Sequence, residues 1–159
     1  MKIKTAAAIS ALLTVAIAAP AFASPDVYVV NFRNAKDVKS QQLDTQLPAA
    51  LSMSGVRAEE VVIDTTTAAK WEKGAHEAFD RDIVPVFNQW VGLPGFAAVV
   101  DADTKRVIGC VNSTFDANEI ARELQKMASA AQGRAFTSRA SVSAKTTRCP
   151  APHNVDNGQ

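Results

Sequence analysis

Hydrophobic positions along residues 26–131 recur with two periods, and each change of period marks a new element. The run Val27–Phe32 is almost continuously apolar and rich in β-branched residues, which predicts a central strand covered on both faces. Residues 36–53 then carry an apolar side chain every three or four positions, which predicts a helix. Pro48 interrupts this pattern, and Gly55 can end the helix as a C-cap.

The middle of the chain predicts a second strand and a long helix. Val61–Ile63 form a short β-branched run, and an apolar residue then recurs every four positions. The recurring positions are Trp71, Ala75, Phe79 and Ile83. We expect this face to be core, together with Phe87 and Trp90 further along. Pro85 has no amide hydrogen to donate, so a kink or a restart of the helix is expected there.

A hairpin and a helix complete the pattern. Residues 96–100 and 106–111 predict two strands joined by the polar turn 101–105. Asp116 is a good N-cap, and Glu119 can return the second hydrogen bond of a capping box. The expected buried stripe of this helix is Ile120, Leu124 and Met127, with Phe115 as a hydrophobic staple.

The order strand, helix, strand, helix, hairpin, helix predicts an α/β fold over residues 24–131. Its core would be a central mixed sheet of about four strands flanked by helices. Residues 132–159 lose the apolar periodicity and are rich in Ser, Thr, Asn, Arg and Pro, so we expect a flexible tail there.

The first 23 residues resemble a secretory signal peptide. Lys2 and Lys4 precede an uncharged apolar run, and Ala21 and Ala23 are small residues placed for cleavage before Ser24. A transmembrane anchor is the alternative, but the run is shorter than the roughly 20 residues that span a bilayer. No cysteine follows the cleavage point, as a lipoprotein would require. We therefore expect a periplasmic or secreted protein without a membrane span after cleavage.

Charged residues are unevenly distributed along the chain that would remain after cleavage. Residues 24–128 carry 11 Lys and Arg against 15 Asp and Glu, whereas residues 129–159 carry four against one. The basic residues of the tail are sparse and are not interleaved with aromatic residues, which disfavours a nucleic-acid partner. We expect the tail to contact an acidic protein surface or to be solvated.

Cys110 and Cys149 are the two cysteines. In an oxidising compartment an even count favours a disulfide. By the chain-entropy estimate, closing a loop of this size contributes roughly 4 kcal/mol to stability. A redox pair, or an intermolecular tether through a free Cys149, remains the alternative.

Other catalytic and cofactor motifs are missing from the sequence. His76 and His153 are isolated, whereas zinc sites need three or four ligands at recurring spacings. Asp80 and Asp82, two positions apart on a predicted helix, cannot form a catalytic carboxylate pair. No phosphate-binding glycine loop and no nucleophile elbow is present. The sequence thus predicts no cofactor, no metal and no catalytic residue.

The element order resembles the thioredoxin fold, and Gly92-Leu93-Pro94 before the hairpin resembles the cis-proline loop of that family. Gly95 and Phe96 place more spacing before the strand than the family usually shows. The larger departure is chemical. Thioredoxins carry a C-x-x-C motif after the first strand, and residues 33–39 contain no cysteine. The resemblance therefore implies the fold without thiol–disulfide exchange at this position.

A narrower resemblance is to exported, dithiol-free thioredoxin-like proteins of integrating conjugative elements. It rests on Trp90, the loop 92–94, the string 98–101 (Ala-Val-Val-Asp) and the string 107–109 (Val-Ile-Gly). It implies an accessory protein of a conjugative transfer or envelope system that binds a protein partner. The rim expected to bind is Asn34, Ala35, Lys36, Trp90, Leu93, Pro94 and Phe96. The alternative is a periplasmic thiol–disulfide oxidoreductase or isomerase that uses Cys110 and Cys149; the oligomeric state stays open.

Overall fold

The structure is a computed structural model that describes residues 24–133 and 148–153. The predicted signal peptide and most of the predicted tail lie outside these ranges. Eight elements follow in chain order. They are β1 (Val27–Arg33), α1 (Val38–Ser54), β2 (Ala58–Asp64), α2 (Ala68–Asp80), α3 (Val84–Trp90), β3 (Phe96–Asp101), β4 (Val107–Asn112) and α4 (Ala117–Ala131).

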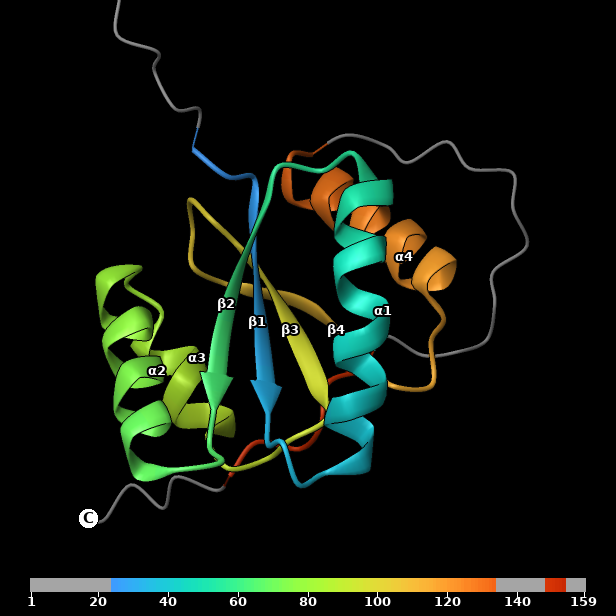
Figure 1. The fold of residues 1–159 in the computed structure, drawn as a ribbon. Coiled ribbons are helices and arrows are strands. Elements are labelled where there is room, and N and C mark those ends of the chain that lie inside the picture. Colours follow the sequence, from blue (N-terminus) through green and yellow to red (C-terminus); the bar gives the residue numbers. More distant parts are fainter. Residues whose placement is uncertain (1–23, 134–147, 154–159) are drawn as a thin grey trace, which may run out of the picture.

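The four strands form one mixed sheet in the order β2-β1-β3-β4 (Figure 1). β1 runs parallel to β2 and antiparallel to β3, and β3 pairs antiparallel with β4. The predicted fold class, α/β with a central mixed sheet flanked by helices, is confirmed. This strand order is compatible with a thioredoxin-like fold.

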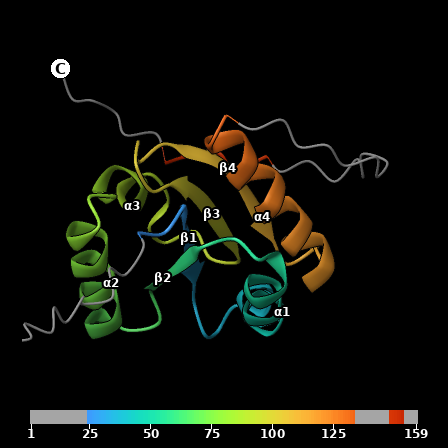
Figure 2. The same ribbon diagram turned by 90° about the horizontal axis from the view of Figure 1, so that it is seen from above.

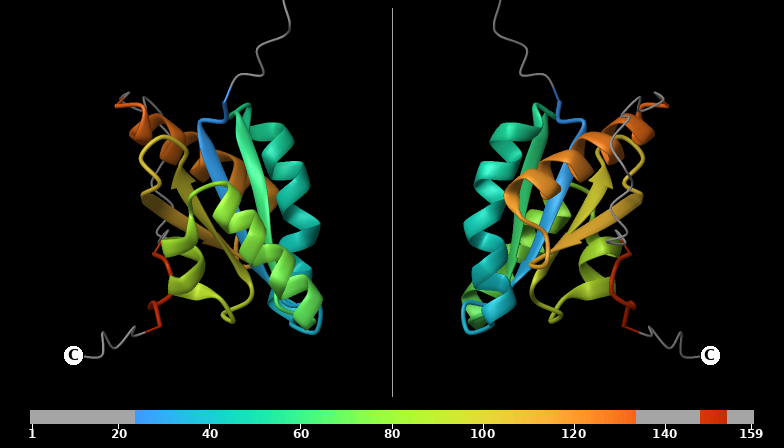
Figure 3. Two further views of the ribbon diagram at one scale, coloured as in Figure 1. Left: turned by 90° about the vertical axis from the view of Figure 1, so that its left-hand side faces the viewer. Right: turned by 90° about the vertical axis from the view of Figure 1, so that its right-hand side faces the viewer.

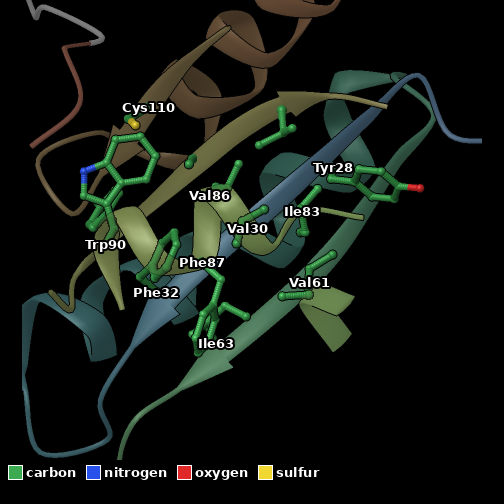
Figure 4. Close-up of a cluster of buried hydrophobic side chains, with 14 of the residues drawn as sticks. Tyr28, Val30, Phe32, Val61, Ile63, Ile83, Val86, Phe87, Trp90 and Cys110 are labelled. Carbon is green, nitrogen blue, oxygen red and sulfur yellow. The ribbon is translucent and has the colours of Figure 1, made fainter. Parts of the chain in front are cut away.

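Helices cover both faces of the sheet, α1 and α4 on one side and α2 and α3 on the other (Figure 2). Successive residues of a strand point to opposite faces, so β1 supplies both cores. Val27 and Val29 pack toward α1 and α4, while Val30 and Phe32 pack toward α2 and α3 (Figure 4). Burial on both faces explains why the β1 sequence is almost continuously apolar.

The expected helix punctuation is present. The Asp37 side chain caps α1 by accepting from the Ser40 amide at 2.7 Å, and Gly55 ends the helix with φ 63°. α1 continues through Pro48, which lies exposed, so proline does not divide this helix. Asp116 and Glu119 form the predicted capping box at the start of α4.

The predicted buried stripe of α2 is wrong in part. Trp71 is 46% exposed and Phe79 is 73% exposed, whereas Gly74 and Ala78 face the sheet. A Cβ atom at Gly74 would lie 3.3 Å from the Ile63 Cα, so α2 approaches β2 through its smallest side chains. This close approach turns the two large aromatic residues away from the core.

The expected restart near Pro85 is confirmed. α2 ends at Asp80, Asp82 has φ 57°, and Pro85 lies in the first turn of α3. Proline suits this turn because its missing amide would have no helical acceptor there. α3 then buries Phe87 and Trp90 as predicted.

The loop from Gly92 to Gly95 joins α3 to β3. The peptide bond before Pro94 is trans, as are all others among the described residues, so the resemblance to a cis-proline loop is corrected. Gly92 and Gly95 both have φ 90°, a conformation that lets the chain turn from α3 into β3. The Gly95 amide donates to the Phe32 carbonyl at 2.9 Å, which fixes the loop beside the end of β1.

Gly95→Ala and Gly92→Ala separate backbone strain from close approach. Both place a side chain at a left-handed φ, which costs about 1–2 kcal/mol. A Cβ at Gly95 would also lie 2.6 Å from the Lys39 Cβ, whereas nothing lies within 4 Å at Gly92. We expect Gly95→Ala to destabilise more, by about 1–3 kcal/mol of overpacking. Urea denaturation of both variants measures this difference, and equal losses would contradict the close approach.

Candidate functional site

The turn Asn34–Lys36 follows β1, where a thioredoxin would begin its dithiol motif. The Ala35 amide donates to the Thr66 hydroxyl at 2.8 Å, and the Asn34 side-chain amide lies 3.4 Å from the Thr65 carbonyl. The turn is therefore fastened to the connection between β2 and α2. Lys36 points into solvent.

Two aromatic residues of the predicted partner rim belong to the core. Trp90 and Phe96 are each 3% exposed. Trp90 contacts Phe32 and Phe96 edge-on at centroid distances of 6.2 and 5.8 Å, and Phe32 stacks on Phe96 at 5.0 Å. Both rings are therefore buried in this structure and do not line an exposed rim. Leu93 and Pro94 are half-buried beside them.

The C-terminal segment Arg148–His153, which we call the strap, lies against α3 (Figure 3, red). The Trp90 Nε1–H donates to the Pro150 carbonyl at 3.0 Å. The His153 amide donates to the Gln89 carbonyl at 3.0 Å, and His153 Nε2 lies 3.0 Å from the Val91 carbonyl oxygen. These contacts anchor part of the predicted tail, and sequence patterning gave no sign of them.

The strap is also attached covalently. Cys110 of β4 and Cys149 form a disulfide with their Cα atoms 4.9 Å apart, which confirms the predicted pairing. Cys110 is 3% exposed within the core beside α3, and Cys149 is half-buried against that core. Neither cysteine is free. Because both sulfurs are in the disulfide, thiol–disulfide exchange here begins only with a thiolate from another molecule.

A cluster of charged and polar groups lies at the carboxyl ends of β1 and β2. Asp64 is 6% exposed; it accepts from the Thr66 amide at 2.8 Å and from the Thr66 hydroxyl, and its Oδ2 lies 3.1 Å from Lys70 Nζ. Arg33 bridges Asp44 at 3.0 Å and Asp64 at 3.7 Å. These ion pairs link the carboxyl ends of β1 and β2 to α1 and α2.

The Asp64 carboxyl has an altered pKa. Burial by itself would raise this pKa, but hydrogen bonds from Thr66 and Lys70 outweigh it, so the pKa lies below its ordinary value. Asn31 is buried nearby and donates to Asp44 and Glu60, each at 3.1 Å. The sequence analysis missed this cluster. The sequence feature that could have predicted the cluster is the pair of polar residues that end β1 and β2, because the carboxyl ends of parallel strands meet at one edge of a sheet.

An exposed aromatic surface lies on the outer side of α2. It consists of Trp71 and Phe79 with Ala75 one turn from each, and Trp71 leans toward Phe87 at a centroid distance of 5.9 Å. The exposed carboxylates of Glu72, Asp80 and Asp82 form no ion pair with the described part of the chain. His76 is exposed on the same helix, as expected.

Across residues 24–133 and 148–153, no group of three or more His, Cys, Asp or Glu side chains could hold a metal ion. Within those ranges no helix is both long and apolar enough to cross a lipid bilayer.

No protein family, curated protein or solved structure matches this chain.

Asp64→Asn tests the charged cluster. A carboxyl whose pKa is lowered by folding stabilises the fold above its unfolded pKa of about 3.9 and loses that contribution as the pH falls through the folded pKa. We expect Asp64→Asn to lower the free energy of unfolding by about 1–3 kcal/mol at pH 7. The difference from wild type should shrink as the pH falls below about 4.

Urea denaturation from pH 7 to pH 2.5 measures this difference. Asp80→Asn is the matched control, because Asp80 is exposed and forms no ion pair within the described ranges. A difference between Asp64→Asn and wild type that does not change with pH would contradict the assignment.

Proposed function

We propose that this chain is an exported, non-catalytic thioredoxin-like protein that binds another protein of the cell envelope. Within that class, we propose an accessory component of a conjugative transfer or related envelope system. The proposed export, to the periplasm or beyond the cell, rests on the signal-like residues 1–23. The conjugative assignment rests on the strings 98–101 and 107–109, which lie on β3 and β4.

The residues at the turn after β1 and the state of the two cysteines support the non-catalytic part of the proposal. The turn after β1 holds Asn34, Ala35 and Lys36 in place of a dithiol, and both cysteines are joined to each other. The ionised groups beside that turn, Asp64 and Arg33, are engaged in ion pairs. A binding role needs none of these groups to react.

The aromatic surface of α2 carries the proposal that a protein is bound. An exposed fraction of 73% for Phe79 and 46% for Trp71 places two large, partly exposed aromatic side chains about two turns apart on one face of the same helix. Aromatic residues are enriched where binding energy concentrates in protein interfaces. The ion-pair-free carboxylates of Glu72, Asp80 and Asp82 beside them favour a partner with an apolar contact bordered by Lys or Arg.

Photo-crosslinking in cells tests this surface. Benzoylphenylalanine in place of Phe79 should give one discrete adduct of higher mass in the envelope fraction. The matched control places the same group at Val38, which is 63% exposed on α1, across the sheet from α2. No adduct at position 79, or the same adduct at both positions, would argue against a specific partner.

The variant Phe79→Ser separates binding from folding. Phe79 is mostly exposed, so its replacement should change the unfolding free energy by no more than about 0.5 kcal/mol. It should nevertheless weaken the crosslink formed from a probe at Trp71. A large loss of stability in Phe79→Ser would instead assign the ring a structural role.

A thiol–disulfide oxidoreductase or isomerase is the second candidate. The observation in its favour is that Cys149 is only half-buried, whereas Cys110 is 3% exposed. We expect no acceleration of insulin reduction by dithiothreitol and no refolding of scrambled ribonuclease. Activity that disappears in Cys110→Ser would replace the binding proposal with this enzyme.

A further inference from the structure

The strap makes two kinds of contact with the end of α3. The covalent contact is the disulfide to Cys110. The others are hydrogen bonds, and two of them use main-chain atoms of the strap, the Pro150 carbonyl that accepts from Trp90 and the His153 amide that donates to Gln89. Any extended peptide can present a carbonyl and an amide in this way, so the end of α3 does not require the strap's own side chains.

The strap buries little of itself. Cys149 is its half-buried residue, and Arg148, Pro150, Ala151, Pro152 and His153 are exposed. A few hydrogen bonds do not offset the conformational entropy lost when six residues are ordered. The disulfide therefore keeps the strap in place.

We infer that the end of α3, formed by Trp90, Gln89 and Val91, is a binding site for an extended peptide segment. In the oxidised protein the strap fills this site, and reduction of Cys110–Cys149 by a dithiol opens it to a partner segment. This inference does not depend on the α2 surface or on its partner.

The opening step is an ordinary thiol–disulfide exchange. A thiolate of the dithiol attacks the Sγ of Cys149, the less buried of the two residues, and Cys110 leaves as a thiolate that takes up a proton. The second thiol of the reagent, losing its proton, then attacks the mixed disulfide and releases Cys149. The reagent is oxidised by two electrons to its own disulfide, and the protein is left with two thiols.

The strap indicates which ligands the site accepts. Trp90 Nε1–H needs a carbonyl acceptor when buried, and the Gln89 carbonyl takes an amide donor three residues further along the bound segment. Pro150 and Pro152 have no amide hydrogen, so proline at these positions lowers the number of amide donors that the bound segment must satisfy. The ligand class is therefore an extended, proline-containing peptide.

Exchange of the two indole N–H groups with water tests the opening step in the full chain. In the oxidised, isotope-labelled protein, the Trp90 indole should exchange many-fold more slowly than the half-exposed Trp71, with signals assigned through Trp71→Phe. Dithiothreitol should raise the Trp90 rate toward that of Trp71 while β1 amides stay protected. Unchanged Trp90 exchange, with both thiols shown free by alkylation and mass, overturns the inference.

A second variant keeps the test decisive. Cys110→Ser with Cys149→Ser should show fast Trp90 exchange without reductant and an unchanged far-ultraviolet circular dichroism spectrum. If reduction and this variant both abolish protection throughout β1, the disulfide only maintains the fold and the inference is wrong.

The binding site is tested with a synthetic peptide of residues 146–155 in which serine replaces Cys149. At a concentration of roughly tens of millimolar, well above the roughly millimolar effective concentration of the strap that stays tethered in the reduced protein, it should slow Trp90 exchange. It should have no effect on the oxidised protein. The same peptide with His153→Pro, which lacks the amide that donates to Gln89, is the control, and equal slowing by both peptides, or by neither, overturns the peptide site.

Discussion

Burial of β1 on both faces is the constraint on which the rest of the structure depends. Val27 and Val29 face one core, and Val30 and Phe32 face the other. Because the strand carries apolar side chains on both faces, both faces of the sheet must be shielded from water, and helices cover them. The positions of α1 and α4 on one side, and of α2 and α3 on the other, follow from this requirement.

Elements set by local chemistry could be predicted from the sequence. The capping box at Asp116, the restart at Pro85 and the four strands each depend on residues close together in the chain. The pairing of Cys110 with Cys149 is a long-range exception, and it could be predicted because an exported chain was expected and two cysteines in an oxidising compartment favour a disulfide. Such features need no knowledge of how distant elements pack.

The candidate sites could not be predicted because they depend on packing between distant elements. Apolar residues at every fourth position on α2 indicated a buried face. The face that packs on the sheet is instead the neighbouring one, where the small residues Gly74 and Ala78 allow a close approach to Ile63. Trp90 was expected at an exposed rim, but Phe32, Phe96 and the strap enclose it. The Asp64 cluster likewise forms only after β1 and β2 pair in parallel register.

The small face of α2 has an evolutionary consequence. Because Gly74 and Ala78 make the contact with the sheet, the residues on the outer side of this helix contribute little to folding. Substitutions there are under weak selection for stability, so they can change one at a time while the domain keeps its shape. A lineage could thus change the exposed surface of α2 without first acquiring compensating mutations in the interior.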